Sequence, residues 1–161
     1  MAVRYIDRLN DHYRSQGFPA YTWSSYDDSP WTPLTKPLRE CRVSMLTSGG
    51  VSCSWQPPFD PMARNDLRVI EIPREAPADG FVINDSYYDH TDADHDINCV
   101  FPIERMREFE ASGVIGELSP RLFSGFMGRI YTRTTVLEEA APALVTKLRE
   151  DHVDAFVLVP A

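Results

Sequence analysis

The sequence predicts an α/β domain of three layers, in which helices cover both faces of a mostly parallel sheet. Short apolar runs, typical of strands that are buried on both faces, alternate along the chain with segments of helical spacing. The length of 161 residues, of which 43% are hydrophobic, suits one domain with one core. We therefore expect residues 1–161 to form a single domain.

Four segments are predicted strands because they are apolar and bounded by turn-forming residues: 41–47, 67–72, 81–84 and 155–159. The first ends at the turn Ser48-Gly49-Gly50 and the second at Pro73. We expect the mostly parallel sheet to include 41–47, 67–72 and 155–159.

Apolar residues at steps of three and four predict three helices. The first covers residues 2–16 and ends at Gly17, and the second covers 103–112. The third places four residues on one face, with Pro142 in its first turn or at a kink: Leu137, Ala141, Leu144 and Leu148.

The N-terminal region, residues 1–38, is predicted to be this first helix followed by an extended segment. Residues 18–38 contain four prolines and, after Phe18, the aromatic residues Tyr21, Trp23, Tyr26 and Trp31. Such a segment cannot be helical, and its aromatic side chains can pack across the domain surface or onto another subunit. The second arrangement predicts a homo-oligomer.

Composition excludes several classes of partner. The formal net charge is -8, which argues against nucleic acid and anionic membranes as ligands. No apolar run reaches the roughly 18 residues that a membrane span needs, and the N-terminus lacks the apolar stretch of a secretion signal. We expect a cytoplasmic protein with a small-molecule substrate.

The three cysteines, Cys41, Cys53 and Cys99, form neither a disulfide framework nor a zinc motif. A buried, inert thiol is the simplest interpretation of each. Cys53 and Cys99 are the candidates for a nucleophile, although carboxylates near Cys99 would raise its pKa.

Three polar segments follow predicted strands: residues 47–50, the segment 88–99, and Pro160-Ala161. Ligands of an open parallel sheet bind outside the carboxyl ends of its strands, so these segments could converge on one cleft. Backbone N–H groups of Ser48, Gly49 and Gly50 could bind an anion there, although two glycines also suit a plain tight turn.

Residues 88–99, called the Asp/His segment below, are the strongest local signal. Its side chains could serve as acid and base, or as ligands of a divalent metal, for which we predict His90, Asp92, Asp94 and Asp96. In an extended loop these four residues share one side and His95 faces the other. The alternative is that the aspartates cap the helix near Ile103 and face water.

Five parts of the sequence resemble the glycine/sarcosine/betaine and D-proline reductase selenoprotein B family: Val43 to Val51, Gln56 to Asp60, Tyr88 to Pro102, Phe123 to Gly128, and Val153 to Pro160. The resemblance covers most of the chain from about Arg39 onward, and the Asp/His segment is its most specific part. Ser52 departs from the pattern, because a His is expected after Gly49-Gly50-Val51.

The resemblance implies reductive cleavage of a C–N bond by a selenol or thiol, on a small amino-acid-derived substrate and within a complex of several subunits. It suggests His90, Asp94, Cys99 and Cys53 as catalytic residues, and Ser48, Gly49, Gly50 and Asn98 as substrate ligands. In the family the reactive residue lies just after the last strand, and here the sequence ends at Pro160-Ala161.

Three interpretations stay open. The reactive segment follows in a longer chain, or Cys53 or Cys99 takes its role. In the third, the protein is a non-redox metal- or ligand-binding subunit that uses the Asp/His segment. Reductase-like chemistry is our predicted function, and the third interpretation is the alternative.

Overall fold

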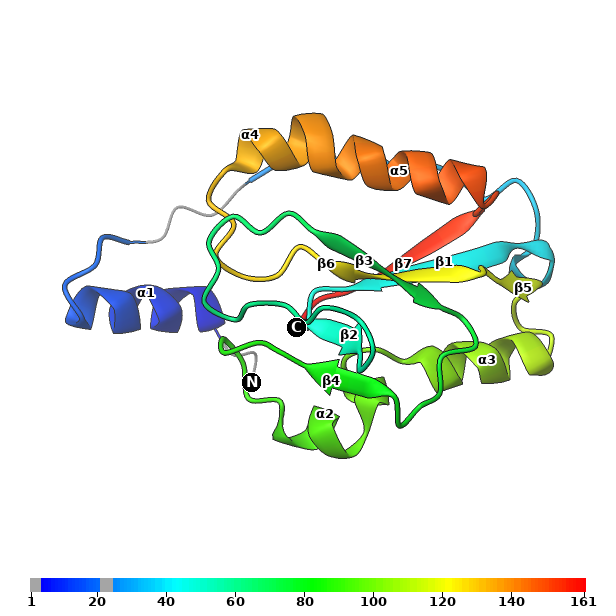
Figure 1. The fold of residues 1–161 in the computed structure, drawn as a ribbon. Helices are drawn as coiled ribbons and strands as arrows, with labels where there is room; N and C mark the ends of the chain where they lie inside the picture. Colours follow the sequence, from blue (N-terminus) through cyan, green and yellow to red (C-terminus); the bar gives the residue numbers. More distant parts are fainter. Residues whose placement is uncertain (1–3, 21–24) are drawn as a thin grey trace. The chain divides into compact units, whose positions relative to one another are not determined.

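The computed structural model describes residues 4–20 and 25–161 (Figure 1). The chain divides into two compact units, residues 1–33 and 34–161, and each is described by itself. Among the described residues, no helix has both the length and the apolar character that a membrane crossing requires.

The first unit contains helix α1, Tyr5–Ser15, which ends as predicted at Gly17. Gly17 has a left-handed backbone with φ 82°. Its N–H donates to the Arg14 carbonyl and the N–H of Phe18 donates to the Tyr13 carbonyl, both at 3.0 Å. This is the Schellman motif, and an edge-on contact between the rings of Tyr13 and Phe18 accompanies it. Tyr21 and Trp23 of the predicted extended segment lie outside the described residues.

The second unit is built on a five-stranded sheet in which β3 pairs with β6, and both β6 and β5 pair with β1. Strand β7 pairs with the opposite edge of β1. The strands are β1 Arg42–Thr47, β3 Val69–Pro73, β5 Glu117–Leu118, β6 Arg121–Gly125 and β7 Ala155–Val159. Strand β1 is parallel to β5, β6 and β7, so the prediction of a mostly parallel sheet is confirmed.

Strand β3 corrects one part of that prediction. The segment 67–72 was expected to be parallel, but β3 runs antiparallel to β6. Residues 48–68, which join β1 to β3, contain β2, Val51–Cys53, but no crossover helix, so the chain enters β3 from the end of the sheet at which β1 finishes and runs opposite to β1 and β6. The predicted strand 81–84 exists as β4, Phe81–Ile83, which pairs with β2 in a separate antiparallel sheet.

The core lies on both faces of the large sheet, because successive residues of a strand point to opposite sides. Met45 of β1 packs in one cluster with Ile103 and Met106 of α3, Ile103–Ala111. Its neighbour Leu46 packs in a second cluster with Leu144 of α5, Ala141–Glu150. Figure 1 shows α5 along one side of the sheet, with α3 and the β2–β4 sheet on the other.

The last helical region differs from the predicted single face. A one-turn helix α4, Arg133–Thr135, and a π-helical turn at Val136–Ala140 precede α5, and Pro142 lies in the first turn of α5. Leu144 is buried as predicted, whereas Leu137 is 69% exposed. The wide π turn changes the helical phase, so Leu137 does not share the face of Leu144.

Ion pairs fix α5 to the sheet. Lys147 of α5 bonds Glu71 of β3, and Arg121 of β6 reaches Glu71 at 3.3 Å and Asp151 at 2.7 Å. These contacts join the start of β6 and the end of α5 to the strand β3.

Candidate functional site

The turn after β1 and the end of β7 lie together at one edge of the sheet. The N–H of Ser48 donates to the Val159 carbonyl at 3.2 Å, and the N–H of Ala161 donates to the Ser48 hydroxyl at 3.1 Å. Because both strands are parallel, their carboxyl ends meet here, which is the usual position of a ligand site in such a sheet.

Close approaches surround both glycines of this turn. A Cβ on Gly49 would lie 3.0 Å from the Tyr88 hydroxyl oxygen and 3.3 Å from the Cβ of Ala161. Gly50 has φ 65°, and a Cβ there would lie 2.7 Å from the Asn84 carbonyl oxygen. The N–H of Gly49 donates to the hydroxyl of Thr47 at 3.1 Å, so it is already used within the turn.

Tyr88 connects the turn to the Asp/His segment. Its hydroxyl donates to the Gly49 carbonyl at 2.9 Å, and its ring meets the imidazole of His90 edge-on, with centroids 5.7 Å apart. Burial, followed by the nearby carboxylates of Asp85 and Asp94, raises the pKa of Tyr88 to about 12. The phenol therefore stays protonated at neutral pH and keeps its role as a donor.

The Asp/His segment is helical at its centre, which corrects the expectation of an extended loop. Helix α2 covers Thr91–His95. It begins after Asp89, whose carboxylate accepts from the N–H and the hydroxyl of Thr91, and these bonds lower the pKa of Asp89. Helical spacing brings His90 and Asp94 together, with Nδ1 of His90 2.9 Å from Oδ2 of Asp94.

The next part of the segment fastens the start of α3. Asp96 accepts from the N–H and the side-chain amide of Asn98, which lowers the pKa of Asp96. Asn98 also donates to Glu104 at 2.8 Å and accepts from its N–H at 3.1 Å. Asp96 therefore caps the 3₁₀ turn Ile97–Cys99 and not the helix near Ile103. The residue that accepts from the start of α3 is Asn98, which was predicted to bind substrate.

The predicted metal ligands are not assembled into one group. His90 and Asp94 lie together, but Asp96 is bonded to Asn98 instead. Over residues 4–20 and 25–161, no three His, Cys, Asp or Glu side chains are grouped so that they could hold a metal ion. A helix turns successive side chains by about 100°, so Asp92 and Asp94 of α2 do not share one side as they would in an extended loop. Asp96 follows the helix with an extended backbone.

The thiols differ in accessibility. Cys41 and Cys53 are buried, and burial raises the pKa of Cys53, which is the behaviour of an inert core thiol. Cys99 is exposed. Of the two cysteines predicted as nucleophiles, only Cys99 is therefore accessible to a reagent.

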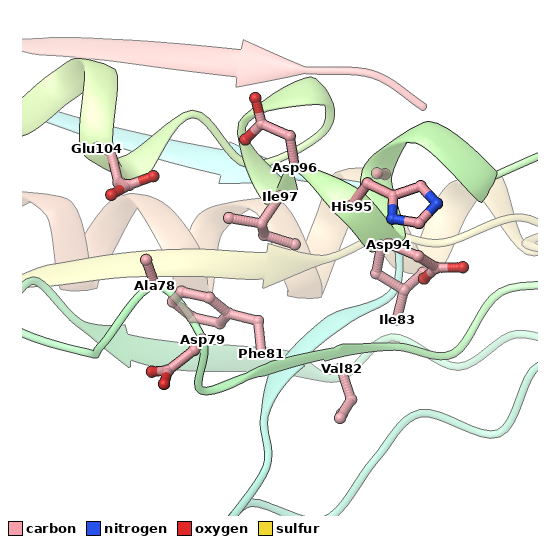
Figure 2. A pocket seen from close by; sticks show the side chains of 11 residues that line it. Ala78, Asp79, Phe81, Val82, Ile83, Asp94, His95, Asp96, Ile97 and Glu104 are labelled. Carbon is pink, nitrogen blue, oxygen red and sulfur yellow. The ribbon is translucent and has the colours of Figure 1, made fainter.

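A cavity of about 690 Å³ lies between β4 and the Asp/His segment (Figure 2). One wall comes from Phe81, Val82 and Ile83 of β4, with the carboxylate of Asp79 beside them, while the other carries acidic side chains and an imidazole: Asp94, His95, Asp96 and Glu104. Apolar walls with a few polar groups are typical of small-molecule sites, and the carboxylates favour a ligand that carries a positive charge.

Two residues of this region were not predicted. Tyr88 was inside the Asp/His segment, but its importance depends on Gly49, which is 39 positions away. Glu104 lies on α3 and reaches the site only because Asn98 folds back onto the start of that helix. The sequence contains no local signal for either contact.

Comparison with known proteins gives consistent matches. The profile of the family described as glycine/sarcosine/betaine reductase selenoprotein B matches residues 2–161. The chain is 35% identical over 128 residues to the D-proline reductase subunit gamma of Acetoanaerobium sticklandii, which covers 80% of this chain and 52% of that protein.

Two further relatives are more distant. The sarcosine reductase complex component B subunit beta of Peptoclostridium acidaminophilum is 29% identical, over 96% of this chain and 36% of that protein. The glycine reductase complex component B subunit gamma of Carboxydothermus hydrogenoformans is 25% identical, over 98% and 37%. The chain thus spans from about a third to a half of the length of these relatives, and no solved structure matches it significantly.

Proposed function

The chain belongs to the glycine/sarcosine/betaine reductase selenoprotein B family, and on this basis we propose that it is a reductase-like component that binds a small amino-acid-derived substrate. One observation carries the proposal. Tyr88 joins the Gly49 turn to the His90–Asp94 pair, so two of the sequence runs that resemble the family form a single edge of the fold.

The charge of the site supports this class of substrate. The names of the relatives refer to reductases of D-proline, sarcosine and glycine, all of which carry a cationic nitrogen at neutral pH. The cavity beside α2 presents Asp94, Asp96 and Glu104 over an apolar wall. A carboxylate close to a cationic nitrogen lowers the free energy of the bound state, and most effectively where water is excluded.

The His90–Asp94 pair is the proposed acid/base group. A carboxylate next to Nδ1 favours the tautomer with its proton on that nitrogen, which leaves Nε2 free to take or give a proton. Asp94 thereby orients the imidazole of His90, in the way that a carboxylate orients a catalytic histidine in other enzymes.

The electron balance of the proposed reaction requires a partner. Reductive cleavage of a C–N bond replaces that bond by C–H and releases an amine, which consumes two electrons and two protons. Two thiols that become one disulfide supply both. Cys53 is buried and its pKa is raised, so Cys99 is the accessible thiol of the described chain. At least one thiol or selenol then comes from another polypeptide or from a longer form of this chain, which agrees with a multi-component reductase.

Calorimetric titration tests the substrate class. Glycine, sarcosine, betaine and D-proline are titrated separately into the purified protein, into His90→Ala and into His12→Ala. His12 lies on α1 and serves as the matched control. We expect saturable binding of at least one probe, lost in His90→Ala and retained in His12→Ala. If none of the four amines binds to the wild-type protein, the proposed substrate class is wrong.

A non-redox ligand-binding subunit is the second candidate. It is favoured by the bonds of Asp96, Asn98 and Glu104, which build a fixed acidic wall without any thiol. The same titration, followed by assay of amine release with dithiothreitol as reductant and the other subunits present, separates the two. Binding without amine release would select this candidate, and a titration with Mn²⁺ or Zn²⁺ tests for a metal.

A further inference from the structure

Asp85 is the only charged residue that is buried in the part of the chain that the structure describes. It is 8% exposed, and every other carboxylate or cationic side chain of that part is more accessible to water. It follows strand β4 and lies against the glycine turn, because a Cβ on Gly50 would be 3.1 Å from the Cβ of Asp85. The acid/base pair and the cavity walls described above do not include this carboxylate.

The negative charge of Asp85 has no cationic partner within residues 4–20 and 25–161. Its contact is with the backbone, since Oδ1 accepts from the N–H of Tyr87 at 2.8 Å, and no lysine, arginine or histidine of those residues forms an ion pair with it. Burial of a charge without a partner lowers stability. Proteins depart from this rule mainly where a function requires the charge.

The carboxylates that line the cavity are less available to a ligand than Asp85. Three of them are already bonded to side chains of the protein: Asp94, Asp96 and Glu104. The fourth, Asp79, is exposed, so water screens its charge. Asp85 offers an unshared charge that is largely removed from water, where the attraction between opposite charges is stronger.

Tyr88 connects Asp85 to the candidate site. Burial, and then the charges of Asp85 and Asp94, raises the pKa of the Tyr88 phenol, so both carboxylates lie near its hydroxyl. That hydroxyl donates to the Gly49 carbonyl at 2.9 Å. Ile83, two positions before Asp85, lines the same end of the cavity as Asp94 (Figure 2). Asp85 therefore lies close to the end of the cavity that carries the acid/base pair.

We propose that Asp85 binds the cationic nitrogen of the ligand and selects ligands that carry one. This inference rests on the proposed function and adds to it the residue that determines specificity. A protonated amine donates hydrogen bonds to the carboxylate and neutralises its charge, so each group supplies the partner that the other needs away from water. A ligand of the same shape with an uncharged oxygen leaves Asp85 unpaired and should bind less tightly.

A ligand-binding role and a purely structural role have different consequences for stability. Asp85→Asn keeps an acceptor for the N–H of Tyr87 and removes the charge. If the charge is retained for a ligand, its removal should leave the melting temperature of the free protein unchanged or raise it. If Asp85 only fastens the loop, the amide should lower the melting temperature, because it is a weaker acceptor than a carboxylate.

Calorimetric titration with two matched pairs of probes tests the proposal. In each pair an ether oxygen replaces the cationic nitrogen: sarcosine with methoxyacetate, and D-proline with (R)-tetrahydrofuran-2-carboxylate. The wild-type protein should bind the amine of at least one pair more tightly than its oxygen analogue. Asp85→Asn should bind that amine about 10- to 100-fold more weakly and the oxygen analogue with unchanged affinity.

Asp60→Asn is the matched control. Asp60 accepts from the N–H of Met62 at 2.8 Å, as Asp85 does from Tyr87, but it is exposed. Its substitution removes the same charge and the same kind of acceptor, and should leave the affinities for both members of each pair unchanged.

Unchanged amine affinity in Asp85→Asn would overturn the proposal and leave the proposed function standing. An equal loss for both members of a pair would overturn it too, because Asp85 would then act through the fold. Where an oxygen analogue binds too weakly to be measured, the melting temperature decides, and a lower value in Asp85→Asn than in Asp60→Asn counts against the proposal. If the wild-type protein binds none of the amines, the proposed function is wrong and the role of Asp85 with it.

Discussion

The hydroxyl of Tyr88 donates to the carbonyl of Gly49 at 2.9 Å, and the oxygen of that hydroxyl is also the nearest obstacle to any side chain at Gly49. One contact therefore fixes the position of the Asp/His segment and restricts the residue that the turn can hold. The geometry of the proposed site therefore depends on the position of the Asp/His segment and on a glycine at position 49.

Gly49→Ala should destabilise the protein by about 1–3 kcal/mol, because its Cβ would lie 3.0 Å from the Tyr88 oxygen and 3.2 Å from the Thr47 hydroxyl. Urea unfolding followed by fluorescence measures the loss. Gly128→Ala is the control, since its nearest contact is a ring carbon of Tyr87 at 3.3 Å and its backbone needs no positive φ. Equal losses in the two variants would show that the Tyr88 contact is not limiting.

Stability should fall in acid through Glu71. Its hydrogen bond with Lys147, assisted by Arg121, holds the pKa of Glu71 below its ordinary value. A depressed folded-state pKa contributes stability that is present above the unfolded pKa, roughly 4.3, and that is lost as the pH falls through the folded value.

Melting temperatures measured from pH 6 to pH 3 test this in the wild-type protein, in Glu71→Gln and in the exposed control Glu139→Gln. Glu71→Gln should have a lower melting temperature at pH 6 and a shallower decline below pH 4.5 than the wild type. The control should follow the wild-type curve. A decline as steep in Glu71→Gln as in the wild type would assign the acid sensitivity to other carboxylates.

The two histidines of the Asp/His segment should behave differently. His90→Ala and Asp94→Asn should abolish binding of an amine ligand in calorimetry and leave the fold intact. In an extended loop His95 would face away from the other side chains and orient the loop, so His95→Ala would lower stability more than affinity. In α2, however, His95 is exposed and lines the cavity. We now expect His95→Ala to weaken affinity and to change the melting temperature little. A large drop in melting temperature would restore the earlier expectation.

Cys99 should be the thiol that reacts in the native protein. Iodoacetamide at neutral pH should add one group, located at Cys99 by peptide mass spectrometry, because Cys41 and Cys53 are buried. Denaturant should expose the other two. Native labelling at Cys53 would show that the core opens readily, and would return that residue to the candidates for a nucleophile.

The sequence predicted those elements whose formation depends on local pattern. Strand β7 is a continuous apolar run, helix α3 has apolar residues at helical spacing, and Gly17 ends α1 by its left-handed backbone. Strands β5 and β6 were not predicted. Strand β5 has two residues, and the polar Arg121 and Ser124 of β6 interrupt its apolar run, so neither shows a clear alternation.

The sequence predicted that residues 47–50, 88–99 and 160–161 lie together, but not the geometry of the Asp/His segment. The segments after β1 and β7 meet because their strands are parallel neighbours, and strand order is enough to expect this. The arrangement of His90, Asp94 and Asp96 depended on whether residues 90–96 were extended or helical. Aspartate-rich segments suit both states, because the side chain that caps a helix also suits a loop.

The central position of β1 has a consequence for how the chain acquires its structure. Arg42, at the start of β1, contacts Asp154 across 112 positions of sequence, and Leu46 pairs with Phe123. The first strand of the sheet to be synthesised therefore has no partner in the sheet until most of the second unit has been made. Folding rates decrease as contacts become more distant in sequence, so we expect slow folding in which β1 stays exposed on the ribosome. We expect chaperones to bind an apolar strand that stays unpaired for so much of the synthesis.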